Sequence, residues 1–356
     1  MIRLAVGPGV LVGLCAMLGL LLLSACQFGT PSLPPGRIAW PKDGDLWEIN
    51  LGTRDQKKVT DLPRSAAVTG VAWSPDGTQI LYAQFWRPPN ARASGADLFE
   101  ANADGTDAHV FAQRDVDSTV LESPTWVPSG NIYYTVRQIQ GTRETQTIVR
   151  STGEGTPPTT VVDNGYYPSI SADESTIVFV RTTQNGMELR KRALNGPGDG
   201  CVLVPGTVFA ALGQPRISPD GKRVAFGGSG DPTGQPGTCG GSALGQPTVA
   251  SSSSRTGDDG VSPALALGQW FGVLPTPAYA HGLPYDIWAM SLDGGQTTKL
   301  ADVKEDEPTV SWSPDGSHLA IFGVAALYMA DASGSSTSTQ KVVEQGGYGG
   351  LDWAKQ

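Results

Sequence analysis

The chain has 356 residues, with 34 acidic against 25 basic side chains and a formal net charge of −9. An acidic chain without basic clusters binds poorly to nucleic acids or to anionic lipid surfaces, because both carry negative charge themselves. We therefore expect no nucleic-acid partner, and any attachment to a membrane must come from something other than charge.

The N-terminus predicts export. Arg3 gives a positive start, residues 4–23 are almost wholly apolar, and small residues lead into Cys26. The sequence Leu-Ser-Ala-Cys at 23–26 resembles the bacterial lipobox, which implies that Cys26 becomes the lipidated first residue. An uncleaved transmembrane anchor is the alternative, although glycine and proline at 7–9 interrupt the run. We expect a signal peptide over 1–25, a proline-rich linker over 26–36, and an extracytoplasmic protein held at the membrane, on the periplasmic or cell-surface side.

Short apolar strands follow at 37–40, 45–47 and 57–60, and from residue 71 one phrase recurs. Its copies occupy 71–77, 215–221 and 310–316, with weaker ones at 125–130 and 169–173. Each predicts a strand, a Ser-Pro-Asp-Gly turn and a second strand, since Pro presets φ and Gly takes the left-handed position. The residues that we expect to be structural for this reason are Trp73, Asp76, Gly77, Trp126, Asp220, Gly221, Trp312, Asp315, Gly316 and Trp353.

A second phrase, typified by Asp-Leu-Phe at 97–99, predicts a third strand and occurs six times. Six units need six first strands, and the last one is supplied by 350–353 at the C-terminus. The sequence therefore predicts an all-β, six-bladed β-propeller over 37–356, with one blade closed by strands from both termini. The pattern resembles the PD40, WD40-like repeats of the TolB-like propeller superfamily. The α/β domain that precedes the propeller in TolB has no counterpart here, so we expect a member of the superfamily rather than TolB.

We expect long connections on only one face of the propeller. That face carries the loops from second to third strands and the loops from one blade to the next. They include 85–96 and an insertion at about 229–285. Within the insertion, 229–260 is of low complexity, whereas 261–285 is rich in aromatic residues. That second half either folds back on the propeller or docks on a partner. The candidate partner-binding residues are Phe85, Trp86, Arg87, Trp270, Phe271, Tyr279, His281 and Tyr285.

Two cysteines remain once the signal and Cys26 are set aside. Outside the cytoplasm, Cys201 and Cys239 favour a disulfide, with two free thiols as the alternative.

Catalytic chemistry is sparse in the sequence. The three histidines are far apart, no zinc spacing occurs, and no nucleophile elbow is found, so we expect no enzyme and no cofactor. Glu122 and Glu307 are weak candidates for a calcium site. The sequence thus favours a protein-binding scaffold or accessory subunit of a cell-envelope or membrane complex. The alternative is a propeller that binds a small ligand or cation, or acts as an enzyme, through its central channel.

Overall fold

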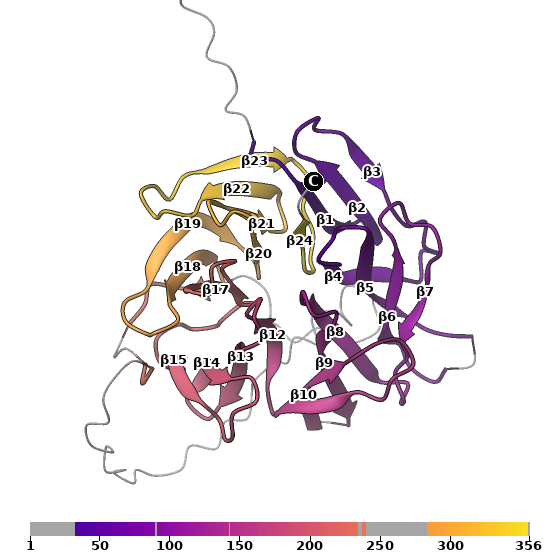
Figure 1. Ribbon diagram of the computed structural model, residues 1–356, viewed down its shortest axis with the longest axis horizontal. Coiled ribbons are helices and arrows are strands. Elements are labelled where there is room, and N and C mark those ends of the chain that lie inside the picture. Colours follow the sequence, from indigo (N-terminus) through magenta and orange to yellow (C-terminus); the bar gives the residue numbers. More distant parts are fainter. Residues whose placement is uncertain (1–32, 90, 142, 234–236, 240–282, 355–356) are drawn as a thin grey trace, which may run out of the picture. The chain divides into compact units, whose positions relative to one another are not determined.

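The computed structural model describes residues 33–89, 91–141, 143–233, 237–239 and 283–354. The predicted signal peptide, the lipidation site at Cys26 and most of the linker lie outside these residues. Residues Pro35–Gln356 form one compact unit, and the elements found in it are strands (Figure 1). The described part of the chain has no helix that could span a bilayer.

The strands form six blades of four antiparallel strands each, which confirms the predicted fold class; a parallel bridge between Ala96 and Val120 joins the first and second blades into one sheet. Figure 1 shows β4, β8, β12 and β24 toward the centre and β3, β7, β15 and β23 at the periphery. The closing blade has the order β24-β1-β2-β3, so the C-terminal strand pairs with the N-terminal one, and Trp353 lies opposite Ile38. Its strands are β24 (Asp352–Ala354), β1 (Arg37–Lys42), β2 (Asp45–Asn50) and β3 (Gln56–Lys58).

The other five blades follow in chain order. The first blade consists of β4 (Ala67–Trp73), β5 (Gln79–Trp86), β6 (Gly95–Asn102) and β7 (His109–Ala112). The second consists of β8 (Thr119–Trp126), β9 (Ile132–Gln140), β10 (Arg143–Ser151) and β11 (Thr159–Asp163). The third consists of β12 (Tyr166–Ile170), β13 (Thr176–Thr183), β14 (Gly186–Ala193) and β15 (Cys201–Val204). The fourth consists of β16 (Arg216–Ile217), β17 (Arg223–Ser229), β18 (Tyr285–Ser291) and β19 (Thr298–Glu305). The fifth consists of β20 (Thr309–Trp312), β21 (His318–Phe322), β22 (Leu327–Asp331) and β23 (Thr339–Val343).

The repeated phrase forms the turn between the first and second strands. In the first blade, the Ser74 hydroxyl donates to the Asp76 carboxylate over 2.7 Å, and the Thr78 amide donates to the same oxygen over 3.0 Å. These hydrogen bonds lower the pKa of Asp76 to about 2, the Ser74 hydroxyl contributing most. Gly77 has a φ of 69°, which a residue without Cβ adopts at least cost. The aspartates of this phrase therefore hold turns.

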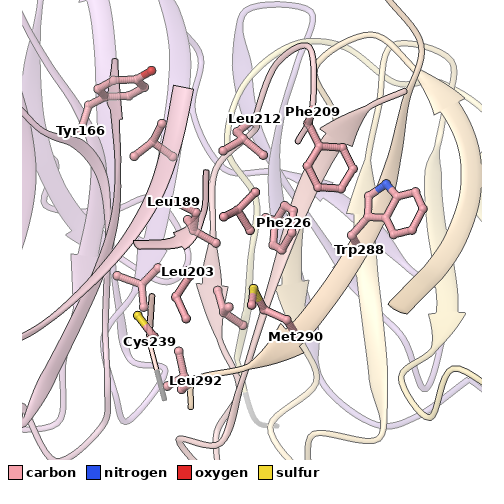
Figure 2. Packing of buried hydrophobic residues seen from close by; sticks show 14 residues of the cluster. Tyr166, Leu189, Leu203, Phe209, Leu212, Phe226, Cys239, Trp288, Met290 and Leu292 are labelled. Atoms are coloured by element: carbon pink, nitrogen blue, oxygen red, sulfur yellow. The ribbon is translucent and has the colours of Figure 1, made fainter. Parts of the chain in front are cut away.

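The apolar core lies between blades. The largest described cluster joins the third blade to the fourth, with Phe209, Phe226 and Trp288 packed ring against ring (Figure 2). The repeat tryptophans Trp73 and Trp312 belong to equivalent clusters at two other blade junctions. Burial of this kind makes each blade depend on its neighbours, which is why the chain closes on itself.

Polar side chains on the innermost strands join neighbouring blades. Thr125 of β8 donates to the Pro168 carbonyl of β12 over 3.0 Å, and the Ser169 hydroxyl accepts from the Ile217 amide of β16 over 2.8 Å. In the closing blade, the Asp352 carboxylate accepts hydrogen bonds from the first and the fifth blade. The inner edge is therefore held by hydrogen bonds as well as by packing.

Candidate functional site

The propeller presents two different faces. We call the loop face the one formed by connections after second and fourth strands, among them 87–94, 113–118, 230–284 and 323–326. The opposite, turn face is formed by the tight turns after first and third strands. The insertion begins and ends on the loop face, although most of it lies outside the described residues, and the other connections named above leave from that face, as predicted. Loops of this kind on a rigid scaffold are the usual carriers of binding.

The first of these loops is shorter than the sequence suggested. Phe85 continues β5 and pairs with Ala96 of β6, and its side chain is buried against Ala96 and Val120. Phe85 is therefore wrong as a partner-binding residue, because its ring faces the core. Trp86 is half-buried, and its indole Nε1 donates to Asp97 over 2.6 Å. Arg87 is exposed and stays a candidate.

Asp97 is the centre of a network that fastens this loop. Besides Trp86, its carboxylate accepts from the Arg114 amide and from the Arg114 guanidinium, each over 2.8 Å. The ion pair is almost fully buried, so it fixes the connection between the first and second blades firmly.

The same aspartate recurs at the start of other third strands. Asp45 accepts from the Leu62 amide over 2.7 Å, and Asp286 accepts from the Lys304 amide over 3.2 Å. Each therefore ties down the end of the outer strand, or the connection after it, in its own blade. The Asp-Leu-Trp phrase predicts the third strand. It does not reveal that the aspartate binds a backbone amide, because that amide lies far along the chain.

The insertion of the fourth blade is described only at its ends. Trp270, Phe271, Tyr279 and His281 lie outside the described residues and stay predictions. Tyr285 begins β18, is buried, and pairs with Ser229, so it is wrong as a surface contact. Whether 261–282 folds back or docks on a partner is likewise outside the described residues.

A disulfide joins Cys201 of β15 to Cys239, with their Cα atoms 5.2 Å apart. Beside it, the Thr238 amide donates to the Val202 carbonyl over 2.7 Å. Cys239 also packs in the cluster shown in Figure 2, near Leu292. The insertion is thus fastened, through 237–239, to the outer edge of the preceding blade.

The carboxylates considered for calcium are placed differently from each other. Glu122 forms a 2.7 Å ion pair with Arg137, whose side chain is fully buried. Burial raises the pKa of Glu122, against the opposing attraction of Arg137. Glu307 lies on the loop face before β20, and it contributes to raising the pKa of Tyr167, for which burial is the main cause. The described residues hold no group of three or more histidines, cysteines, aspartates or glutamates arranged for a metal. The pairing with Arg137 makes Glu122 a poor metal ligand, because the guanidinium already neutralises it.

Comparisons with known proteins establish the fold. No protein-family model matches the chain, and no curated protein matches it. Among solved structures, TolB from Acinetobacter baumannii is similar with a TM-score of 0.59 and 13% identity, over 99% of this chain and 75% of that chain. A chain from a nidogen/laminin complex is similar with a TM-score of 0.57 and 9% identity, over 89% of this chain and 98% of that chain. The chain has a TolB-like six-bladed β-propeller fold.

Proposed function

We propose that this protein is a lipid-anchored extracytoplasmic propeller that serves, without catalysis, as a protein-binding scaffold or accessory subunit of an envelope complex. Two parts of this proposal are independent. One concerns the loop face as the place where a protein partner binds, and the other concerns the anchor at the N-terminus.

The distribution of exposed apolar side chains is the observation that carries the first part. Four large hydrophobic side chains are exposed among the described residues, and three of them lie on the loop face: Val116, Leu283 and Val324. They come from three separate connections, at 113–118, 230–284 and 323–326. Exposed apolar side chains at several connections of the same face favour contact with another protein there.

The rigidity of that face supports the same proposal. The Asp97 and Asp286 clasps hold the bases of two connections, so less conformational entropy is lost when a partner binds. One of the two similar propellers was solved in a complex of nidogen with laminin, which illustrates the fold in a protein assembly.

Crosslinking in native membranes tests whether a protein partner binds the loop face. Variants on that face are compared with one elsewhere on the propeller. We expect Val116→Asp and Val324→Asp to reduce recovery of a crosslinked partner several-fold, because a buried charge opposes apolar contact. Val110→Asp on outer strand β7 is the matched control, since Val110 is exposed but lies away from the loop face. Equal recovery with all three variants would count against the loop face as the binding surface.

The anchor rests on the sequence at 23–26, and it has its own test. Replacing Cys26 with serine removes the sulfur that would carry the lipid. We expect the Cys26→Ser protein to lose its lipid and to change its mobility on gels, whereas Cys201→Ser keeps both. Unaltered lipid labelling of Cys26→Ser would refute the anchor and leave the partner proposal untouched.

A further inference from the structure

A cleft opens on the turn face, opposite the face that the sequence favoured. It lies between the second and third blades and has a volume of about 350 Å³. Its walls come from β9, β10 and β11 on one side and from the end of β14 with the following turn on the other. The lining residues are Tyr133, Arg150, Thr159, Thr160, Val161, Arg192 and 194–198.

Two arginines, one from each blade, meet in this cleft. Neither Arg150 nor Arg192 forms an ion pair with any described carboxylate, in a protein with an excess of acids. The guanidinium of Arg192 is held in place instead by backbone carbonyls, since Nη2 donates to Val161 over 2.7 Å and Nη1 donates to Gly198 over 3.1 Å. Carbonyl groups orient a guanidinium without carrying a formal negative charge; the Asp199 carboxylate, whose pKa is lowered mainly by Arg181, is also attracted by Arg192 but forms no ion pair with it.

Both side chains also keep a donor without an acceptor. The Nε atoms of Arg150 and Arg192 are shielded from solvent and have no hydrogen-bond partner in the described structure. A buried donor without an acceptor destabilises the folded chain, because its hydrogen bond to water is lost and not replaced. Native proteins meet such a cost where a water, an ion or a ligand completes the bonding.

The carboxylates nearest to the cleft are already engaged. Glu174 accepts from the Asn131 amide over 2.9 Å and from the Tyr133 hydroxyl over 2.7 Å. Burial alone would raise the pKa of Glu174, but those hydrogen bonds and the attraction of Arg150 lower it. Asp199 pairs with Arg181 over 2.9 Å, outside the cleft. Glu174 and Asp199 thus offset part of the positive charge of the two cleft arginines, but neither carboxylate pairs with them directly.

We propose that this cleft binds a small solute that carries an oxyanion, a carboxylate or a phosphate ester, with Arg150 and Arg192 recognising its charge. Guanidinium groups match the geometry of both oxyanions through paired hydrogen bonds. The hydroxyls of Thr159 and Thr160 line the cleft beside them and suit the polar remainder of such a molecule. The volume lies near the lower end of the range of ligand pockets, about 300–1,000 Å³, which favours a small solute over a polypeptide segment.

Binding by the purified full-length protein in neutral detergent tests the proposal. The probes are inorganic phosphate, glycerol phosphate and citrate, titrated calorimetrically at constant ionic strength against chloride. We expect at least one of them to bind saturably and to raise the melting temperature. Arg150→Gln should weaken that binding by about tenfold or more, the effect of about 1.4 kcal/mol.

Arg143→Gln is the matched control, because it removes an exposed arginine from the opposite end of β10, outside the cleft lining. Arg150→Lys keeps the charge and loses the paired geometry, so it should bind with intermediate affinity, and it replaces Arg150→Gln if the latter fails to fold. Absence of saturable binding to every probe would overturn the proposal, as would equal losses in Arg150→Gln and Arg143→Gln. A crosslinked protein partner lost in Arg150→Gln, with no solute bound, would overturn it in favour of a macromolecular ligand.

Discussion

Replacing Asp352 by alanine tests how the ring of blades is closed. In β24, one carboxylate oxygen accepts from the Trp73 amide of the first blade over 2.9 Å, and the other accepts from the Ser311 hydroxyl of the fifth blade over 3.1 Å. The closing strand is thus bonded to both neighbouring blades by one side chain. Burial lowers the pKa of Arg216, and the negative charge of Asp352 partly counteracts that effect.

The expected magnitude follows from these contacts. A hydrogen bond to a charged group contributes about 1.5–3 kcal/mol, and a donor left without an acceptor adds to the loss. We expect Asp352→Ala to lower the free energy of unfolding by about 3–4 kcal/mol, a large part of the total of about 5–15 kcal/mol for a typical protein. Ser311→Ala removes one bond and should cost about 1 kcal/mol.

Urea denaturation, followed by tryptophan fluorescence, measures these values. The double variant with Ser311→Ala should cost less than the sum of the two single changes, because the two residues share one hydrogen bond. Asp293→Ala is the control, since its carboxylate is 94% exposed and should contribute less than about 0.5 kcal/mol. If Asp352→Ala were no less stable than Asp293→Ala, closure would depend on packing and backbone pairing instead.

Three further predictions concern stability. Removing the disulfide with Cys201→Ser should cost about 3–4 kcal/mol, given its separation of 38 residues, and reductant should abolish the difference from wild type in urea melts. Gly105→Ala should destabilise the protein more than Gly221→Ala, although both glycines have a positive φ. The Cβ added at Gly105 would lie 2.0 Å from the Val59 carbonyl oxygen, whereas the one added at Gly221 would meet open space. Equal melting temperatures of the two variants would contradict this. Three turn carboxylates, those of Asp76, Asp173 and Asp315, each have a pKa lowered from 3.8 to about 2, mainly by a serine hydroxyl. They stabilise the fold when ionised, so the free energy of unfolding should fall as the pH drops from about 4 to about 2. Replacing all three with asparagine should flatten that pH profile.

The blades could be predicted because their turns are encoded locally. Serine, proline, aspartate and glycine in succession specify hydrogen bonds and φ angles within a few residues, so each copy marks a hairpin without knowledge of the rest. Even the third blade follows the pattern, where Glu174 adopts a φ of 53° at the position that glycine holds elsewhere.

The errors lie where the outcome depends on distant partners. Phe85 and Tyr285 stand beside long loops, and only their pairing with Ala96 and Ser229 places them in strands with buried rings. The cleft on the turn face is a similar case. Arg150 and Arg192 each lie one residue before the end of a third strand, in different blades, so nothing in the local sequence of either indicates that they meet.

The positions of the cleft and the loop-face connections follow from how a propeller is built. Adjacent blades pack tightly where large side chains from both sheets interlock, as in the cluster that contains Leu189 of the third blade and Phe226 of the fourth. Between the second and third blades, the third-strand ends instead carry arginines, whose charge resists burial in an apolar layer. The junction therefore stays open at the turn face. Because the cleft and the loop-face connections lie at opposite ends of the strands, we expect binding of a solute in the cleft and of a protein on the loops to be independent.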